Sequence, residues 1–140
     1  MEQHTIPPQV AGVFSGFPEG PRRQLLEIRT LIFAVAGSTA GVGPVTETLK
    51  WGEPAYLTEA THSEGAIRLG IRRDTLADCA VLINCRTSLV GTFREPFPNV
   101  FRYEKHRAIL LRSAEPLPSA LAACLELALT YHQRSRARGR

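Results

Sequence analysis

The 140-residue chain lacks the short motifs that identify most enzymes and metalloproteins. It has no GxSxG nucleophile turn, no HExxH zinc motif and no GxxxxGK[ST] phosphate loop, and its GxG at 41–43 leads toward a strand. The four histidines are widely spaced, without an HxH or HxxxH pair. We therefore expect no catalytic residues and no metal ligands from a local motif. An enzyme whose site is assembled from scattered residues stays open as an alternative.

Long apolar runs are lacking as well. Runs such as Leu31 to Ala36 are far shorter than the roughly 20 residues that span a bilayer. The segment from Met1 to His4 has neither the basic nor the apolar region of a secretory leader. With 44% hydrophobic and 21% charged residues, the composition is typical of a globular domain. These features predict a cytoplasmic protein without a membrane partner.

The body of the chain has no excess of either charge. The net charge of +4 comes from four arginines in the last seven residues; without them, Lys+Arg equal Asp+Glu at 13. A nucleic-acid-binding domain usually carries its basic patch on the folded surface. We therefore expect no specific nucleic-acid partner, a single domain over residues 1–133, and a flexible Arg-rich tail over 134–140.

Cysteine is also scarce, and its placement indicates packing instead of chemistry. Cys79, Cys85 and Cys124 form no CxxC pair, and each lies among aliphatic residues. Free cysteine in such surroundings behaves as a small hydrophobic residue. We expect three buried, reduced thiols.

Helical periodicity marks both ends of the chain. Apolar residues at 10, 13, 14 and 17 predict a short helix after Pro7-Pro8, and Gly20-Pro21 opens the main helix, which should end just before Gly37. Arg29 belongs to the polar side of that helix. A last helix should follow Pro118 and fray from Gln133 onward.

Between these helices the period changes from 3.6 to 2, which is typical of strands. Leu49 and Trp51 share one side of the first strand, so Trp51 is expected in the core; the alternative is a partly exposed aromatic at a pocket edge or dimer contact. Pro54 should mark the start of the second strand. The expected strands are 46–51, 55–57, 66–72, 79–85, 100–103 and 108–112, with a short helix at 89–94.

The clustered short strands and segregated helices predict an α+β fold, not a doubly wound α/β fold. We expect an antiparallel sheet of five to six short strands, with the N- and C-terminal helices packed on one face. A neutral body with free edge strands is also compatible with a homodimer.

One string of residues resembles a known family. The segment Lys50-Trp51-Gly52-Glu53-Pro54-Ala55-Tyr56, followed by Ile67 to Ile71, resembles the bacterial domain of unknown function 1801 family, the YdhG-like domains. Supporting pieces occur in the family's order at 85–89, 106–110 and 131–132, so the likeness runs from about Gly20 to His132.

The resemblance implies a sandwich of helices on an antiparallel sheet, as in frataxin. Some members of the family are regarded as intracellular iron chaperones. Iron chaperoning would require carboxylates gathered on one surface, whereas the acids of this chain are scattered along the sequence. We therefore expect no cofactor, and iron only under the alternative of a frataxin-like iron chaperone.

The candidate binding residues lie on or beside the expected strands. If Arg68, Arg72, Arg86, Arg107 and Lys50 share the face that bears Tyr56, they would form a cationic and aromatic site for an anion. The alternative is a solvated strand face whose arginines pair with Glu47, Glu53 and Glu104. We predict a non-catalytic binding or adaptor module for a small anion or a protein partner. The site residues are Lys50, Trp51, Glu53, Tyr56, Arg86 and Arg107.

Overall fold

The computed structural model describes residues 5–58, 67–72, 79–83, 102–104 and 108–138. Its strands are β1 (Thr46–Lys50), β2 (Glu53–Leu57), β3 (Ile67–Ile71), β4 (Cys79–Ile83), β5 (Arg102–Glu104) and β6 (Ala108–Leu111). They form one antiparallel sheet in the order β1-β2-β3-β4-β6-β5. The order places β1 and β5 at the two edges, and β3 and β4 near the middle.

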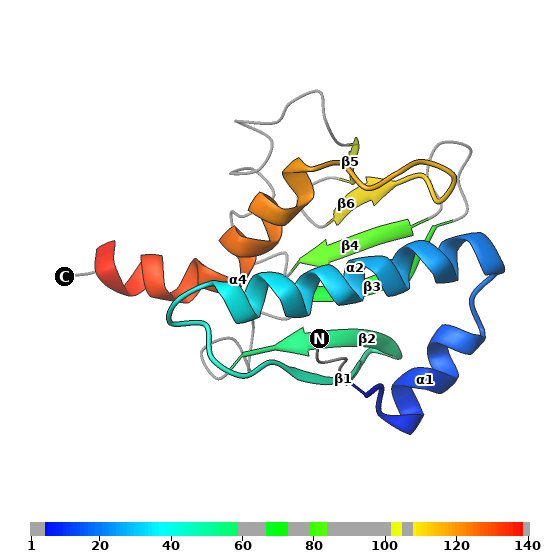
Figure 1. The fold of residues 1–140 in the computed structure, drawn as a ribbon, viewed down its shortest axis with the longest axis horizontal. Helices are drawn as coiled ribbons and strands as arrows, with labels where there is room; N and C mark the ends of the chain where they lie inside the picture. Colours follow the sequence, from blue (N-terminus) through cyan, green and yellow to red (C-terminus); the bar gives the residue numbers. More distant parts are fainter. Residues whose placement is uncertain (1–4, 59–66, 73–78, 84–101, 105–107, 139–140) are drawn as a thin grey trace.

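Three helices accompany the sheet: α1 (Pro8–Ser15), α2 (Glu19–Ser38) and α4 (Ala120–Arg138). Figure 1 shows α2 crossing in front of the strands, with α1 beside β1 and β2 and α4 beside α2. The main core lies between this helix layer and the sheet, where Leu25, Ile28 and Ile32 of α2 are fully buried. The predicted α+β architecture is therefore confirmed.

Both faces of β4 and β6 are apolar. In β4, all five residues are buried, as predicted for a central strand. On the face away from the helices, Ala80 and Leu82 of β4 cluster with Ala108 and Leu110 of β6. Alternation along the strands thus gives the sheet two apolar layers, and only the layer on the helix side belongs to the main core.

Several predicted boundaries are wrong for local physical reasons. Helix α2 continues through Gly37 to Ser38, whose hydroxyl donates to the carbonyl oxygen of Ala34, and it ends at Thr39. Helix α4 continues to Arg138 because 133–138 contain good helix formers and the next breaker is Gly139. That helix occupies much of the segment predicted to be a flexible tail, and the predicted helix at 89–94 lies outside the described residues.

Two of the three cysteines are described, and both are buried free thiols, as predicted. Burial raises the pKa of Cys124 to about 11, so its reactive thiolate form is rare at neutral pH. Cys85 lies outside the described residues.

Candidate functional site

The two strands β1 and β2 are joined by a two-residue turn, Trp51-Gly52. Lys50 and Glu53 flank it as register partners. Both turn residues have positive φ, 56° for Trp51 and 77° for Gly52, as in the type I′ turns that suit the twist of a hairpin. Glycine adopts this conformation freely, but a tryptophan in it is strained.

The turn also places the indole in solvent. Trp51 is 89% exposed, and it is the one large hydrophobic side chain described as exposed. The prediction that Trp51 belongs to the core is therefore wrong. Strand alternation does not extend to this residue, because β1 ends at Lys50 and the chain reverses there.

An ion pair lies beside the turn, on the face of the sheet away from the helices. The Arg68 guanidinium of β3 donates to the Glu53 carboxylate at 2.6 Å. The carboxylate reaches over Gly70, where an added Cβ would collide with it. This pair agrees with the alternative to the predicted site, in which a strand arginine pairs with Glu53, and Gly70 supplies the space for it.

Tyr56 lies on the opposite face of β2, fully buried in the main core. Its hydroxyl donates to Glu47 Oε2 at 2.8 Å. Arg29 of α2 donates to the same carboxylate through Nε at 2.6 Å and through Nη2 at 2.8 Å. The Arg29 and Glu47 side chains are only 8% and 4% exposed, so these three side chains form a buried polar network.

Aromatic contacts complete this network. The Arg29 guanidinium carbon lies 5.0 Å from the ring centroid of Phe33, and that ring meets Tyr56 edge to face at 5.9 Å. The hydrogen bonds that Arg29 donates to Glu47 raise the pKa of Arg29, and burial raises the pKa of Tyr56. Both side chains therefore keep their protons at neutral pH, and the network joins α2 to the first hairpin.

Helical periodicity does not reveal this network, because it places Arg29 on the polar side of its helix. The sequence nevertheless contains one signal for a buried ion pair. Glu47 has the same parity in β1 as Leu49, and so it faces the core. A carboxylate on that side needs a cationic partner, because an unpaired buried charge is costly.

The structure therefore brings together only part of the predicted site. Lys50, Trp51 and Glu53 lie together at the hairpin tip. Tyr56 is buried in the main core, on the helix side of the sheet. The condition that the cationic residues share a face with Tyr56 is not met by Arg68. Arg86 and Arg107 lie outside the described residues, so their part in binding stays a prediction.

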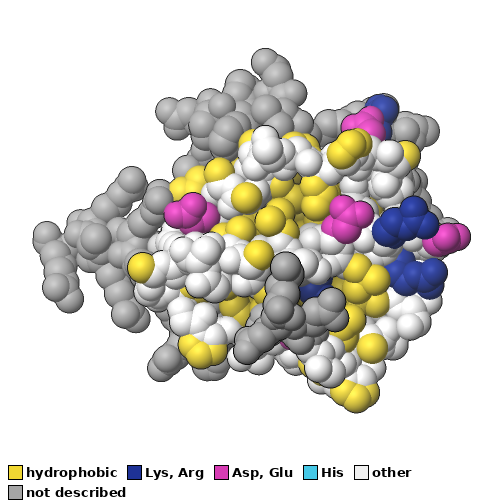
Figure 2. All heavy atoms as spheres, in the orientation of Figure 1, with side chains coloured by type: hydrophobic (Ala, Val, Ile, Leu, Met, Phe, Trp, Pro, Cys, Tyr) yellow, Lys and Arg dark blue, Asp and Glu magenta, His cyan; other side chains and the backbone are white. Residues whose placement is uncertain are grey.

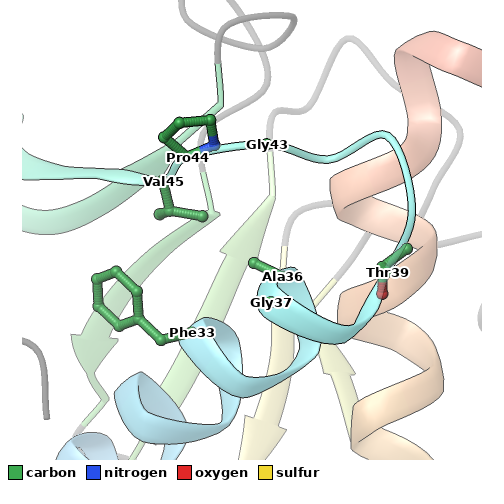
Figure 3. A pocket seen from close by; sticks show the side chains of 7 residues that line it. All are labelled: Phe33, Ala36, Gly37, Thr39, Gly43, Pro44 and Val45. Carbon is green, nitrogen blue, oxygen red and sulfur yellow. The ribbon is translucent and has the colours of Figure 1, made fainter. Parts of the chain in front are cut away.

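A separate open depression of about 580 Å³ lies between the end of α2 and the segment that leads into β1 (Figure 3). The Phe33 ring and the Val45 side chain face it from its two sides. No charged side chain contributes to its described lining, which consists of Phe33, Ala36, Gly37, Thr39, Gly43, Pro44 and Val45.

Within the described residues, no three His, Cys, Asp or Glu side chains are grouped as a metal site would require. On the face shown in Figure 2, the described acidic side chains lie apart from one another. Among the described helices, none combines the length and apolar character needed to cross a membrane. Iron binding stays an alternative.

The fold and hairpin define a class, an α+β domain with one antiparallel sheet under a helix layer. The structure is similar to the crystal structure of YdhG, a protein from the DUF1801 family from Bacillus subtilis, with a TM-score of 0.61. The match has 14% sequence identity and covers 91% of this chain and 90% of that one. No family model and no curated protein matches the sequence. The likeness confirms the YdhG-like fold.

Proposed function

We propose that this domain is a non-catalytic binding module that meets a protein partner at the tip of the β1–β2 hairpin. The observation that carries the proposal is the 89% exposure of Trp51 in a left-handed backbone conformation. An exposed tryptophan gains nothing from core packing, and the strained turn makes its placement costly to the isolated domain. Tryptophan is among the residues that contribute most to binding when a partner covers it.

The surroundings of the indole support a protein partner. Lys50 and Glu53 flank the turn, and Arg68 forms an ion pair with Glu53 beside it. This gives an aromatic anchor with a charged rim, which is the usual anatomy of a protein interface. The small-anion version of the proposal depends on Arg86 and Arg107 and is tested by changing each to alanine.

The test compares wild-type protein with Trp51→Asn and Trp51→Phe as baits for partners from the source cells. Asparagine suits a type I′ turn and removes the ring, whereas phenylalanine keeps an aromatic ring in the same strained position. A partner captured by the wild type should bind Trp51→Asn at least about 30-fold more weakly, as for a hot-spot residue. Trp51→Phe should keep much of the affinity.

Fluorescence gives a direct second readout, because Trp51 is the single tryptophan of the chain. The free domain should be fully open to acrylamide quenching, and the purified partner should protect it. A partner that binds Trp51→Asn as tightly as wild type, with quenching unchanged, would refute the proposed function.

A further inference from the structure

The edge strand β1 offers unused backbone groups. In a two-residue hairpin the residues that flank the turn exchange backbone hydrogen bonds, and this alternates along the strand. Lys50, Thr48 and Thr46 therefore point their N–H and C=O groups toward β2, while Glu47 and Leu49 point theirs away from the sheet. In the described part of the chain, neither Glu47 nor Leu49 has a backbone hydrogen bond outside the strand pairing.

This edge also lacks most of the features that keep sheet edges apart. Natural edge strands are usually short, bulged, or interrupted by proline or charge. Strand β1 has five residues without proline. Its one inward-facing acid, Glu47, is paired with Arg29, and its one lysine, Lys50, is the register partner of Glu53 within the hairpin.

We propose that the partner of the hairpin is a second copy of this chain, paired antiparallel through β1; this rests on the proposed function. The register that uses every outward backbone group of both strands sets Glu47 opposite Leu49 of the other copy. Thr48 then faces its own symmetry mate as a non-hydrogen-bonded pair on the two-fold axis. The result is one continuous sheet through both copies.

The side chains on the exposed face fit this register. Threonine pairs across antiparallel strands are favourable. Lys50 lies opposite Thr46 of the other copy, so the two lysines stay four positions apart and do not face each other. Each Lys50 also keeps Glu53 as its register partner within its own hairpin.

In the same register, the surface of the other copy covers Trp51. This register sets Lys50 opposite Thr46 of the other copy, so the adjoining turn with Trp51 lies near the segment that leads into β1 there, at the rim of the depression lined by Phe33 and Pro44. An aromatic side chain buries roughly 150–250 Å². Two indoles, the surfaces they cover and the paired strands together come near the roughly 1,200 Å² at the lower end of stable interfaces. A reversible, concentration-dependent dimer is expected.

The decisive test is disulfide trapping of full-length protein. Thr48→Cys puts two thiols on the axis, where Cα atoms of a non-hydrogen-bonded pair are about 4.5 Å apart, within disulfide range. Under mild oxidation this variant should form a covalent dimer on a non-reducing gel. The matched control is Thr46→Cys, on the same face and with the same native cysteines. Its two thiols would lie roughly 13 Å or more apart, so it should not cross-link above the wild-type level.

Sedimentation and quenching complete the test. Wild-type protein should dimerise with rising concentration, and Trp51 should become protected from acrylamide over the same range. Thr48→Lys sets two like charges directly opposite each other and should weaken dimerisation about tenfold.

Equal trapping of both cysteine variants, or a wild-type monomer at the highest soluble concentration, would overturn the inference. If the domain does not dimerise but a different protein still requires Trp51 for binding, the proposed function holds and the dimer inference fails. If Trp51→Asn also leaves that binding unchanged, the proposed function fails separately.

Discussion

Replacing Trp51 by asparagine should stabilise the domain, which is unusual for the loss of a tryptophan. A non-glycine residue in the left-handed region costs about 1–2 kcal/mol, and asparagine tolerates that region better than other side chains. Since Trp51 is 89% exposed, about a tenth of its surface is packed. At about 25 cal/mol per Å², losing that contact costs about 0.6 kcal/mol. The expected balance is a gain of about 0.5–1 kcal/mol.

The assay is thermal unfolding at low protein concentration, where any self-association is negligible. The gain corresponds to a rise in Tm of about 2–4 °C for a domain of this size. Trp51→Ala is the matched control, because it removes the same ring but leaves a strained residue in the turn. It should show no gain. If Trp51→Asn instead costs about 3–5 kcal/mol, the indole is a core residue and the reasoning about the turn is refuted.

Three further predictions concern the packing around the hairpin. Glu47→Gln leaves the buried Arg29 guanidinium without its carboxylate, and urea unfolding should show a loss of about 3 kcal/mol; a loss below 1 kcal/mol would contradict the buried pair. Because burial raises the pKa of Tyr56, its protonated hydroxyl supports folding fully below pH of about 10, and this support fades above it. Above that pH, the Tm of the wild type should therefore fall more steeply than the Tm of Tyr56→Phe. Parallel plots of Tm against pH for the two proteins would contradict the raised pKa of Tyr56. Gly70→Ala should cost about 1–2 kcal/mol, and most of this cost should vanish in a Glu53→Ala background if the carboxylate is what the new methyl meets.

The regular elements of this fold could be predicted well from periodicity alone. Buried β4 shows as a continuous apolar run, and β3 shows as strict alternation of aliphatic residues with Arg68 and Gly70. Both signals arise because burial repeats with the geometry of the backbone. The same reasoning predicts the main helix, although a stop at Gly37 places its end too early.

The hairpin tip could not be predicted in the same way. Alternation assigns Trp51 to the core only if the strand continues through it, and the strand ends one residue earlier. Asn-Gly or Asp-Gly would have indicated a type I′ turn, but Trp-Gly carries no such expectation. The position of Tyr56 relative to Arg68 also requires the register of β2 against β3, in which Ala55 and not Tyr56 lies opposite Arg68.

Helix α4 has a consequence for how the chain acquires its structure during synthesis. Leu121, Cys124 and Leu125 of α4 cover part of the main core, yet α4 follows all six strands in the chain. Neighbouring strands β1 to β4 can pair as they leave the ribosome, because each contacts the next along the sequence. Helices α1 and α2 precede these strands and can cover their apolar face early, but the part of the core that α4 completes stays open until α4 has emerged. During that interval the nascent domain exposes this part of its core, and a chaperone that binds apolar surfaces could bind there.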